Sequence, residues 1–241
     1  MTGAFSWTTA FNIAFNRNKV LELGGEEYKE MAEGDGHLKT GSVRRLIVGE
    51  PIGVFYGYRF DGIFQNEEEC KQQTSSASPI GVGLRRYKDL NGDGKVDAAN
   101  DREILGDANP KFFGGLTNTF AYKGFELNVF LQYSYGNKIL NYNAMELENP
   151  TGGQNAYADM VNRWTPENPS NIYPKATTNR ALLVSDRFIE DGSYLKLKTL
   201  SLSYSFPKIN LKHIQGLRLY VTGQNLLTWT KYRGYDPEVS Y

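Results

Sequence analysis

The sequence predicts an all-β protein, an antiparallel transmembrane β-barrel segment with long extracellular loops. Three observations support this prediction. Apolar and polar residues alternate over stretches of ten residues or more, the connections between these stretches differ greatly in length, and no apolar run approaches the roughly 20 residues of a membrane-spanning helix. A strand that crosses a bilayer needs about 9–11 residues, whereas strands of globular proteins average about 5–6.

The first predicted strand covers residues 4–16 and alternates without interruption. Its odd positions carry mostly large side chains, namely Phe5, Trp7, Thr9, Phe11, Ile13 and Phe15. Its even positions carry Ala, Ser, Thr and Asn. Because successive side chains of a strand point to opposite faces, one face of this strand is aromatic and the other is small and polar.

A second strand region is predicted at residues 53–64, where frequent glycines indicate a bend or a close backbone approach. Two longer alternating stretches follow at residues 111–122 and 125–137. The pair Lys123–Gly124 between them predicts a tight turn, and therefore a long antiparallel hairpin. Phe130 is the one large apolar residue on the polar side of the second stretch.

Two more strands are predicted at residues 193–206 and 216–229. In the first of them Leu195 and Leu197 share a face, but the alternation then resumes at Leu200, one residue out of phase. A shift of one residue would move every later side chain to the opposite face unless the strand bulges. We therefore predict a β-bulge near Lys198–Thr199.

The connections between these strands are uneven. Residues 66–109 and 141–192 form long segments, whereas Lys123–Gly124 and residues 207–216 are short. Long loops at one end and short turns at the other are typical of an outer-membrane barrel, whose apolar face meets lipid and whose polar face lines a wet lumen. A soluble β-sandwich is the alternative, because its strands also alternate and bury their aromatic face against a second sheet.

The stretch DLNGDGKVDAAND, residues 89–101, matches the first half of a calcium-binding loop. Alternating carboxylate and amide oxygens converge on a hard cation, a glycine at the sixth place allows the sharp turn, and the seventh residue offers its carbonyl. The twelfth place is Asn100 rather than the usual Glu, and Asp101 is the candidate replacement. The predicted Ca²⁺ ligands are Asp89, Asn91, Asp93, Lys95, Asp97 and Asp101. An Asx-turn loop without metal is the alternative.

Four aromatic residues of the segment 141–192 are candidates for substrate binding: Tyr142, Tyr157, Trp164 and Tyr173. Such rings stack on sugar rings or on peptide side chains, but they also pack loops onto themselves, and we favour packing.

Composition and motifs argue against several other classes of protein. The 27 Lys and Arg residues balance 27 Asp and Glu residues, so nothing indicates nucleic-acid binding. The single Cys70 has no partner for an internal disulfide. His37 and His213 are the only histidines, and no catalytic Ser/His/Asp order or phosphate-binding loop accompanies them, so we expect no enzyme. The first residues lack the pattern of a signal peptide, which indicates either a cytosolic protein or part of a longer chain.

Four blocks of the sequence together resemble the C-terminal barrel region of SusC/RagA-type TonB-dependent receptors. They are residues 49–65, 87–141, 187–207 and 217–240, and they include the stretches GVFYGYRFDGIF, DLNGDGKVD, GSYLKLKTLSLSYSF and GYDPEVS. Their order and spacing match over nearly the whole chain, residues 1–241. The resemblance implies the C-terminal part of a barrel of about twenty-two strands, in the outer membrane of a Gram-negative bacterium.

The resemblance also implies a function and partners. Such a transporter imports glycan or peptide fragments together with a SusD-like surface lipoprotein, and the TonB system supplies the energy. The family's plug and TonB-contact segment have no counterpart in the sequence, so we expect a fragment of about eight strands or fewer. The alternative function is a soluble β-rich, calcium-stabilised carbohydrate-binding module. In the barrel, the segments 66–109 and 141–192 would lie outside the cell.

Overall fold

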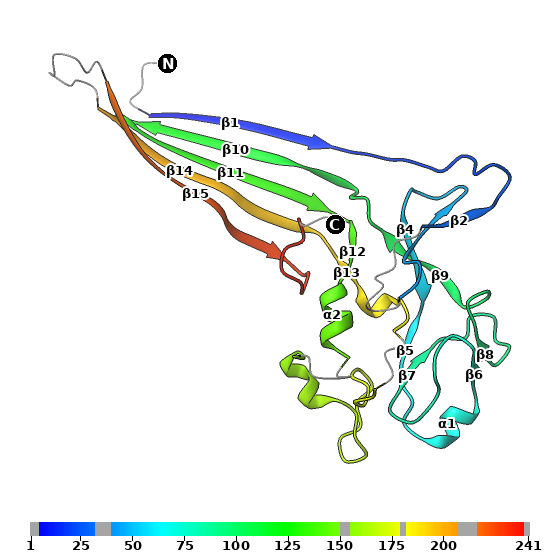
Figure 1. Cartoon of the computed structure of the whole chain (residues 1–241). Coiled ribbons are helices and arrows are strands. Elements are labelled where there is room, and N and C mark those ends of the chain that lie inside the picture. The colour runs from blue at the N-terminus through cyan, green and yellow to red at the C-terminus, as the bar shows by residue number, and fades with distance from the viewer. Residues whose placement is uncertain (1–4, 32–39, 150–154, 179–181, 207–215, 239–241) are drawn as a thin grey trace.

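The computed structural model describes residues 5–31, 40–149, 155–178, 182–206 and 216–238, and these form two parts (Figure 1). One part is a large antiparallel sheet. The other is a loop body, which we define as residues 15–111 and 136–193. Both segments of the loop body leave the same end of the sheet, and the turn between β10 (Phe112–Tyr122) and β11 (Phe125–Tyr135) lies at the opposite end (Figure 1). The all-β prediction and the predicted separation of the long loops from the short turn at Lys123–Gly124 are therefore confirmed. The other predicted turn, residues 207–216, lies outside the described residues except for Gly216.

The large sheet has five strands in the order β1–β10–β11–β14–β15, and all neighbours are antiparallel. The bounds of the strands are Phe5–Ala14 for β1, Phe112–Tyr122 for β10, Phe125–Tyr135 for β11, Tyr194–Phe206 for β14 and Leu217–Thr230 for β15. Strands of 10 to 14 residues are long enough to cross a bilayer. The sheet is open, with β1 and β15 at its edges, so it is a segment of a barrel wall and not a closed barrel.

The predicted hairpin joins β10 to β11 through Lys123 and Gly124. Both residues have positive φ, 46° and 86°, as the two central residues of a type I′ turn require. The backbone twist of this turn matches the right-handed twist of the strands, so Tyr122 pairs with Phe125 directly beside it.

The predicted bulge is also present. Along β11, Leu131 pairs with Leu197 and the adjacent Phe130 pairs with Thr199, which leaves Lys198 as the extra residue of β14. Because of this extra residue, the leucines on both sides of the bulge stay on one face of the sheet.

The first segment of the loop body contains a four-stranded antiparallel sheet in the order β2–β3–β4–β9. Its strands are β2 (Tyr28–Met31), β3 (Arg44–Ile47), β4 (Val54–Tyr58) and β9 (Arg102–Asp107). Around it lie α1 (Glu67–Lys71) and the paired strands β5 (Phe60–Ile63) with β7 (Arg85–Tyr87) and β6 (Thr74–Ser75) with β8 (Lys95–Val96). The strand region predicted at 53–64 thus exists as β4 and β5 but lies in the loop body, and the segment 66–109 contributes β9 to the same sheet.

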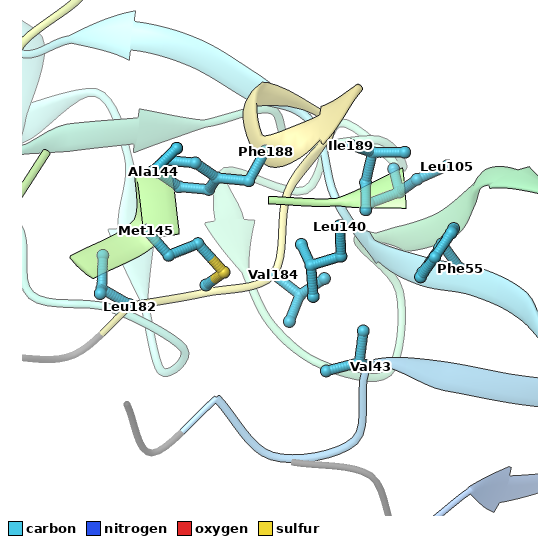
Figure 2. Close-up of a cluster of buried hydrophobic side chains, with 10 residues drawn as sticks. All are labelled: Val43, Phe55, Leu105, Leu140, Ala144, Met145, Leu182, Val184, Phe188 and Ile189. Carbon is cyan, nitrogen blue, oxygen red and sulfur yellow. The ribbon is translucent and has the colours of Figure 1, made fainter. Parts of the chain in front are cut away.

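The second segment contains β12 (Lys138–Leu140), α2 (Tyr142–Leu147), the 3₁₀ turns η1 (Ala158–Asn162) and η2 (Asp186–Phe188), and β13 (Ile189–Asp191), which pairs with β12. One apolar cluster joins it to the first segment (Figure 2). The cluster contains Val43, Phe55, Leu105, Leu140, Ala144, Met145, Leu182, Val184, Phe188 and Ile189. The two long connections therefore share a core and order one another by burying apolar surface.

Candidate membrane-facing sheet and rim sites

The register of the large sheet places apolar side chains of all five strands on one face. One row across the sheet runs through Trp7, Phe120, Leu127, Leu202 and Val221, each directly opposite the next. Trp7 and Val221 at the two ends of this row are 63% and 67% exposed. Among the described residues no second sheet packs on this face, so the arrangement differs from the buried aromatic layer of a β-sandwich and fits contact with lipid.

Aromatic rings gather near both ends of this apolar face. At the turn end the rings of Phe125 and Tyr204 have centroids 4.5 Å apart, and Tyr204 also contacts Phe206. At the end next to the loop body, the rings of Phe112 and Tyr135 stack with centroids 5.0 Å apart. Aromatic belts at both membrane interfaces are typical of outer-membrane barrels.

The opposite face of the sheet is polar. Its middle row runs through Thr119, Asn128, Ser201 and Thr222, and hydrogen bonds join Asn128 to Thr119 (2.9 Å) and Ser201 to Thr222 (2.8 Å). The exception noted in the sequence, Phe130, lies over a glycine of the neighbouring strand. A Cβ atom added to that glycine, Gly115, would lie 2.7 Å from the Phe130 ring, so the missing side chain makes room for the ring.

An ion-pair cluster that the sequence analysis missed lies on this polar face. The ammonium group of Lys196, a residue only 1% exposed, donates to both carboxylate oxygens of Asp236 and to Glu238, each at 2.8 Å. Lys198 donates to Glu238 at 2.7 Å, and Gln132 of β11 donates to it at 3.2 Å. The hydrogen bonds from Lys196 and Lys198 lower the pKa of Glu238 to about 2. The signal in the sequence was the pair of lysines within a strand whose other residues are Leu, Ser, Thr, Tyr and Phe.

A second missed cluster lies in the loop body, around the fully buried Glu148, which follows α2. Its carboxylate accepts hydrogen bonds from Arg187 (2.6 Å) and from Arg233 (3.1 Å). Arg233 also donates to Glu190 of β13 at 2.9 Å, and Glu190 in turn accepts from Asn141 at 3.0 Å. A buried carboxylate needs such partners, because an unpaired charge in this position would cost several kcal/mol.

In the acidic stretch 89–101, the carboxylates accept hydrogen bonds from backbone N–H groups. Asp89 accepts from Gly92 and Gly94 at 2.7 Å, as in an Asx turn. Asp101, which is fully buried, accepts from the backbone of Leu90 and Asp97 at 2.7 Å and so closes the loop.

The remaining predicted ligands lie on the exposed side of this loop. Asp93 accepts from the side chain of Asn91 and from the backbone of Lys95, and the Lys95 ammonium lies 3.2 Å from Asp97. A hydrogen bond from the backbone of Asn100 lowers the pKa of Asp97. In the described part of the chain, no group of three or more His, Cys, Asp or Glu side chains is arranged to hold a metal ion.

The four aromatic candidates pack within the loop body. Tyr142 and Tyr157 lie against the apolar cluster of Figure 2. Trp164 is buried and donates from its indole nitrogen to Gln65 at 3.0 Å. Tyr173 is half-buried, its hydroxyl donates to Asp159 at 3.3 Å, and the guanidinium of Arg187 lies 5.2 Å from the centre of its ring. These contacts match the packing role that we favoured from the sequence, whereas contact with a substrate stays a prediction.

None of the helices in the described ranges combines the length and the apolar character that crossing a membrane requires. No protein-family model matches the sequence. The chain is 39% identical over 239 residues to TonB-dependent receptor P3 of Formosa agariphila, and the match covers 98% of this chain and 24% of that receptor. It is 26% identical over 251 residues to TonB-dependent receptor SusC of Bacteroides thetaiotaomicron, covering 99% of this chain and 23% of SusC.

Among solved structures, the RagAB peptide transporter superposes with a TM-score of 0.74 over 97% of this chain and 25% of that chain, at 24% sequence identity. The chain thus spans about a quarter of the length of the proteins it matches. These proteins are receptors and a transporter rather than enzymes, in agreement with the sequence analysis. The chain belongs to the SusC/RagA-type TonB-dependent receptors of the Gram-negative outer membrane, as its sequence motifs implied, and forms part of their barrel wall.

Proposed function

We propose that this chain is a wall segment of an outer-membrane importer for small polar nutrients, either glycan or peptide fragments, driven by the TonB system. The observation that carries the proposal is the division of one sheet into two faces. The five strands present a continuous apolar face with exposed rings, and behind it a face of Thr, Ser, Asn and Gln that suits a wet lumen. The names of the relatives, TonB-dependent receptors and a peptide transporter, support the same function.

The loop body suggests the position of the partners. It lies at the end of the sheet opposite the short turn, the end that faces the cell exterior in outer-membrane barrels. A SusD-like surface lipoprotein would meet the receptor on this side, while the TonB system would act from the periplasm through parts of the receptor that this chain does not contain. Tyr142, Tyr157 and Tyr173 are half-buried in the loop body and stay candidates for contact with an external solute, whereas Trp164 is buried.

In the proposed transporter, calcium bound to the stretch 89–101 would stabilise the loop body. A carboxylate oxygen that accepts one N–H group keeps further acceptor capacity, so the hydrogen bonds of Asp89 and Asp93 are compatible with a cation on the exposed side. Asn91, Asp97 and the carbonyl group of Lys95 would complete the exposed part of the ligand set. Asp101, the sixth predicted ligand, is fully buried and accepts from the backbone of Leu90 and Asp97, so in this proposal it closes the loop. Modest affinity is sufficient, because extracellular calcium sites bind at about 10⁻⁴–10⁻³ M.

Uptake by living cells tests the proposed function. A strain that lacks the complete receptor gene is complemented with the gene, and accumulation of fluorescent oligosaccharides and of fluorescent oligopeptides is followed with and without a proton uncoupler. Uncoupler-sensitive uptake of one of the two solute classes is expected only in the complemented strain. Equal uptake by both strains over a panel of both classes contradicts an import function.

A further inference from the structure

The segment that follows β15, residues 231–238, is held to both parts of the molecule, and we call it the strap. It leaves the end of β15 next to the loop body and lies close to β13 and α2 (Figure 1). At its start, the Thr230 hydroxyl donates to the carbonyl of Ser193 at 2.8 Å and accepts from the backbone of Tyr232 at 3.1 Å. The chain therefore turns back over the sheet instead of continuing away from it.

One end of the strap is anchored to the loop body. The backbone N–H and the guanidinium of Arg233 both donate to Glu190 at 2.9 Å, and a second guanidinium nitrogen donates to Glu148 at 3.1 Å. Glu148 is fully buried and the side chain of Glu190 is 10% exposed. Arg233 thus inserts its charge between two carboxylates that belong to different elements of the loop body.

The other end of the strap is anchored to the barrel wall. Asp236 and Glu238 bind Lys196 and Lys198 of β14, and the carboxylate of Asp236 also accepts from the backbone of Glu238 at 2.9 Å, which shapes the turn around Pro237. Lys198 is the extra residue of the β-bulge. Without the bulge the lysine two residues after Lys196 would still face the strap, but Thr199 and the later polar residues of β14 would change face, so the bulge combines the lysine pair with an uninterrupted apolar face.

Each anchor contains one buried charge, Glu148 in the loop body and Lys196 in the wall, whereas Arg233 and Asp236 are partly exposed. The two lysines and two carboxylates at the wall are electrically balanced, and Lys196 is almost completely covered. Removal of one partner from a buried pair leaves the other charge uncompensated, so such pairs favour one arrangement over the alternatives. Within the strap the two charged contacts are only five positions apart, from Arg233 to Glu238.

We propose that the strap couples the loop body to the barrel wall, so that the two parts keep one orientation at the mouth of the pore. Arg233, Asp236 and Glu238 are in this view positioning residues, together with their partners Lys196, Lys198, Glu148 and Glu190. The coupling does not depend on which solute is imported. A change in the coupling can therefore be measured even if the proposed uptake is not observed.

Hydrogen exchange measured by mass spectrometry on the complete receptor in detergent tests the coupling. In Glu238→Gln and Lys198→Met, exchange should rise about tenfold in residues 231–238 and also in the loop-body segments 140–149 and 186–191, because a hydrogen bond to a charged group shifts a local opening equilibrium by about this factor. Lys198→Arg keeps the charge and should behave as the wild type. Lys123→Met in the distant turn is the matched control and should change neither segment.

The double variant Arg233→Met/Glu238→Gln makes the test specific for coupling. If the strap transmits the constraint, releasing either end already frees the loop body, and the double variant should exchange there no faster than the single variants. Faster exchange confined to residues 231–238, or loop-body effects that simply add, overturns the proposal. Variants are compared only where the barrel migrates as the folded form in an unheated gel. Glu238→Asp, which shortens the side chain but keeps its charge, is the milder variant if the stronger changes prevent folding.

Discussion

The ammonium group of Lys198 lies 2.7 Å from both carboxylate oxygens of Glu238, although the two residues are 40 positions apart. This contact joins a bulge in the barrel wall to the segment that returns from the edge strand β15. The hydrogen bonds from Lys196 and from Lys198 together lower the pKa of Glu238 from an ordinary value of 4.5 to about 2.

The strap should therefore be stable to mild acid. A carboxylate with a lowered pKa stabilises the folded state above its unfolded pKa, and this contribution is lost as the pH falls through the folded pKa. For Glu238 the loss begins near the ordinary pKa of 4.5 and is complete only below the folded pKa of about 2. The difference in melting temperature between the wild type and Glu238→Gln should be constant from pH 8 to about pH 5 and should shrink progressively as the pH falls toward about 2. A difference that already disappears at pH 6 contradicts this assignment.

The two faces of β15 should respond differently to charge. Val221 and Thr222 are neighbours on opposite faces of the same strand, and they pair with Leu202 and Ser201 respectively. Val221→Arg should destabilise the folded barrel by about 2–4 kcal/mol, because it places a charge in the hydrocarbon region. Thr222→Arg should cost less than about 1 kcal/mol, because a wet lumen solvates the guanidinium.

Urea titration of the receptor folded into lipid vesicles measures both variants. Equal losses of stability would mean that the two faces of β15 do not separate lipid from water.

The stability of the loop body should be sensitive to substitution of the buried Glu148. Glu148→Gln removes one charge between Arg187 and Arg233 and leaves both guanidinium groups without it, which should destabilise the loop body by about 3–5 kcal/mol. The exposed pair of Glu126 and Arg218 on the large sheet is the matched comparison, and Glu126→Gln should cost at most about 1 kcal/mol. Limited proteolysis of residues 136–193 reports on the loop body. Unchanged cleavage in Glu148→Gln would show that this cluster contributes little.

Calcium should stabilise the loop body if the stretch 89–101 binds it. Isothermal titration of Ca²⁺ should give binding in the range of about 10⁻⁴–10⁻³ M, and excess chelator should lower the melting temperature. Asp93→Ala should abolish the binding heat because it removes a predicted ligand. Asn100→Ala is the control, since its side chain is not among the predicted ligands. Absence of heat, or a melting temperature unaffected by chelator, would remove the calcium hypothesis and leave the barrel assignment intact.

The local features of the sheet follow from the sequence to a large extent. The alternation from Phe5 onward, the turn at Lys123–Gly124 and the bulge at Lys198 all depend on the stereochemistry of neighbouring residues, so the sequence predicts them without knowledge of the fold. The region 53–64 was also correctly predicted as strand. Its place in the loop body was not, because the strand β4 pairs with β9 some 50 positions away, and alternation carries no information about such a partner.

The sequence permits a helical turn in residues 26–37, although it favours a solvated connection there. The described part of that range contains no helix. Residues Tyr28–Met31 form β2, which pairs with β3. The short charged segment has too few apolar positions to reveal a period, and pairing with a neighbour overrode its helical propensity.

Side-chain periodicity and turn chemistry alone thus determined that this protein has membrane-length strands with one apolar and one polar face, joined by a tight turn at one end. The tertiary structure decided which distant charges form ion pairs. Glu148 contacts Arg233, and Lys198 contacts Glu238, only because the strands have paired and the chain has turned back. The physical reason is range, since backbone geometry acts between neighbours, whereas an ion pair forms wherever folding brings opposite charges within a few ångströms of each other.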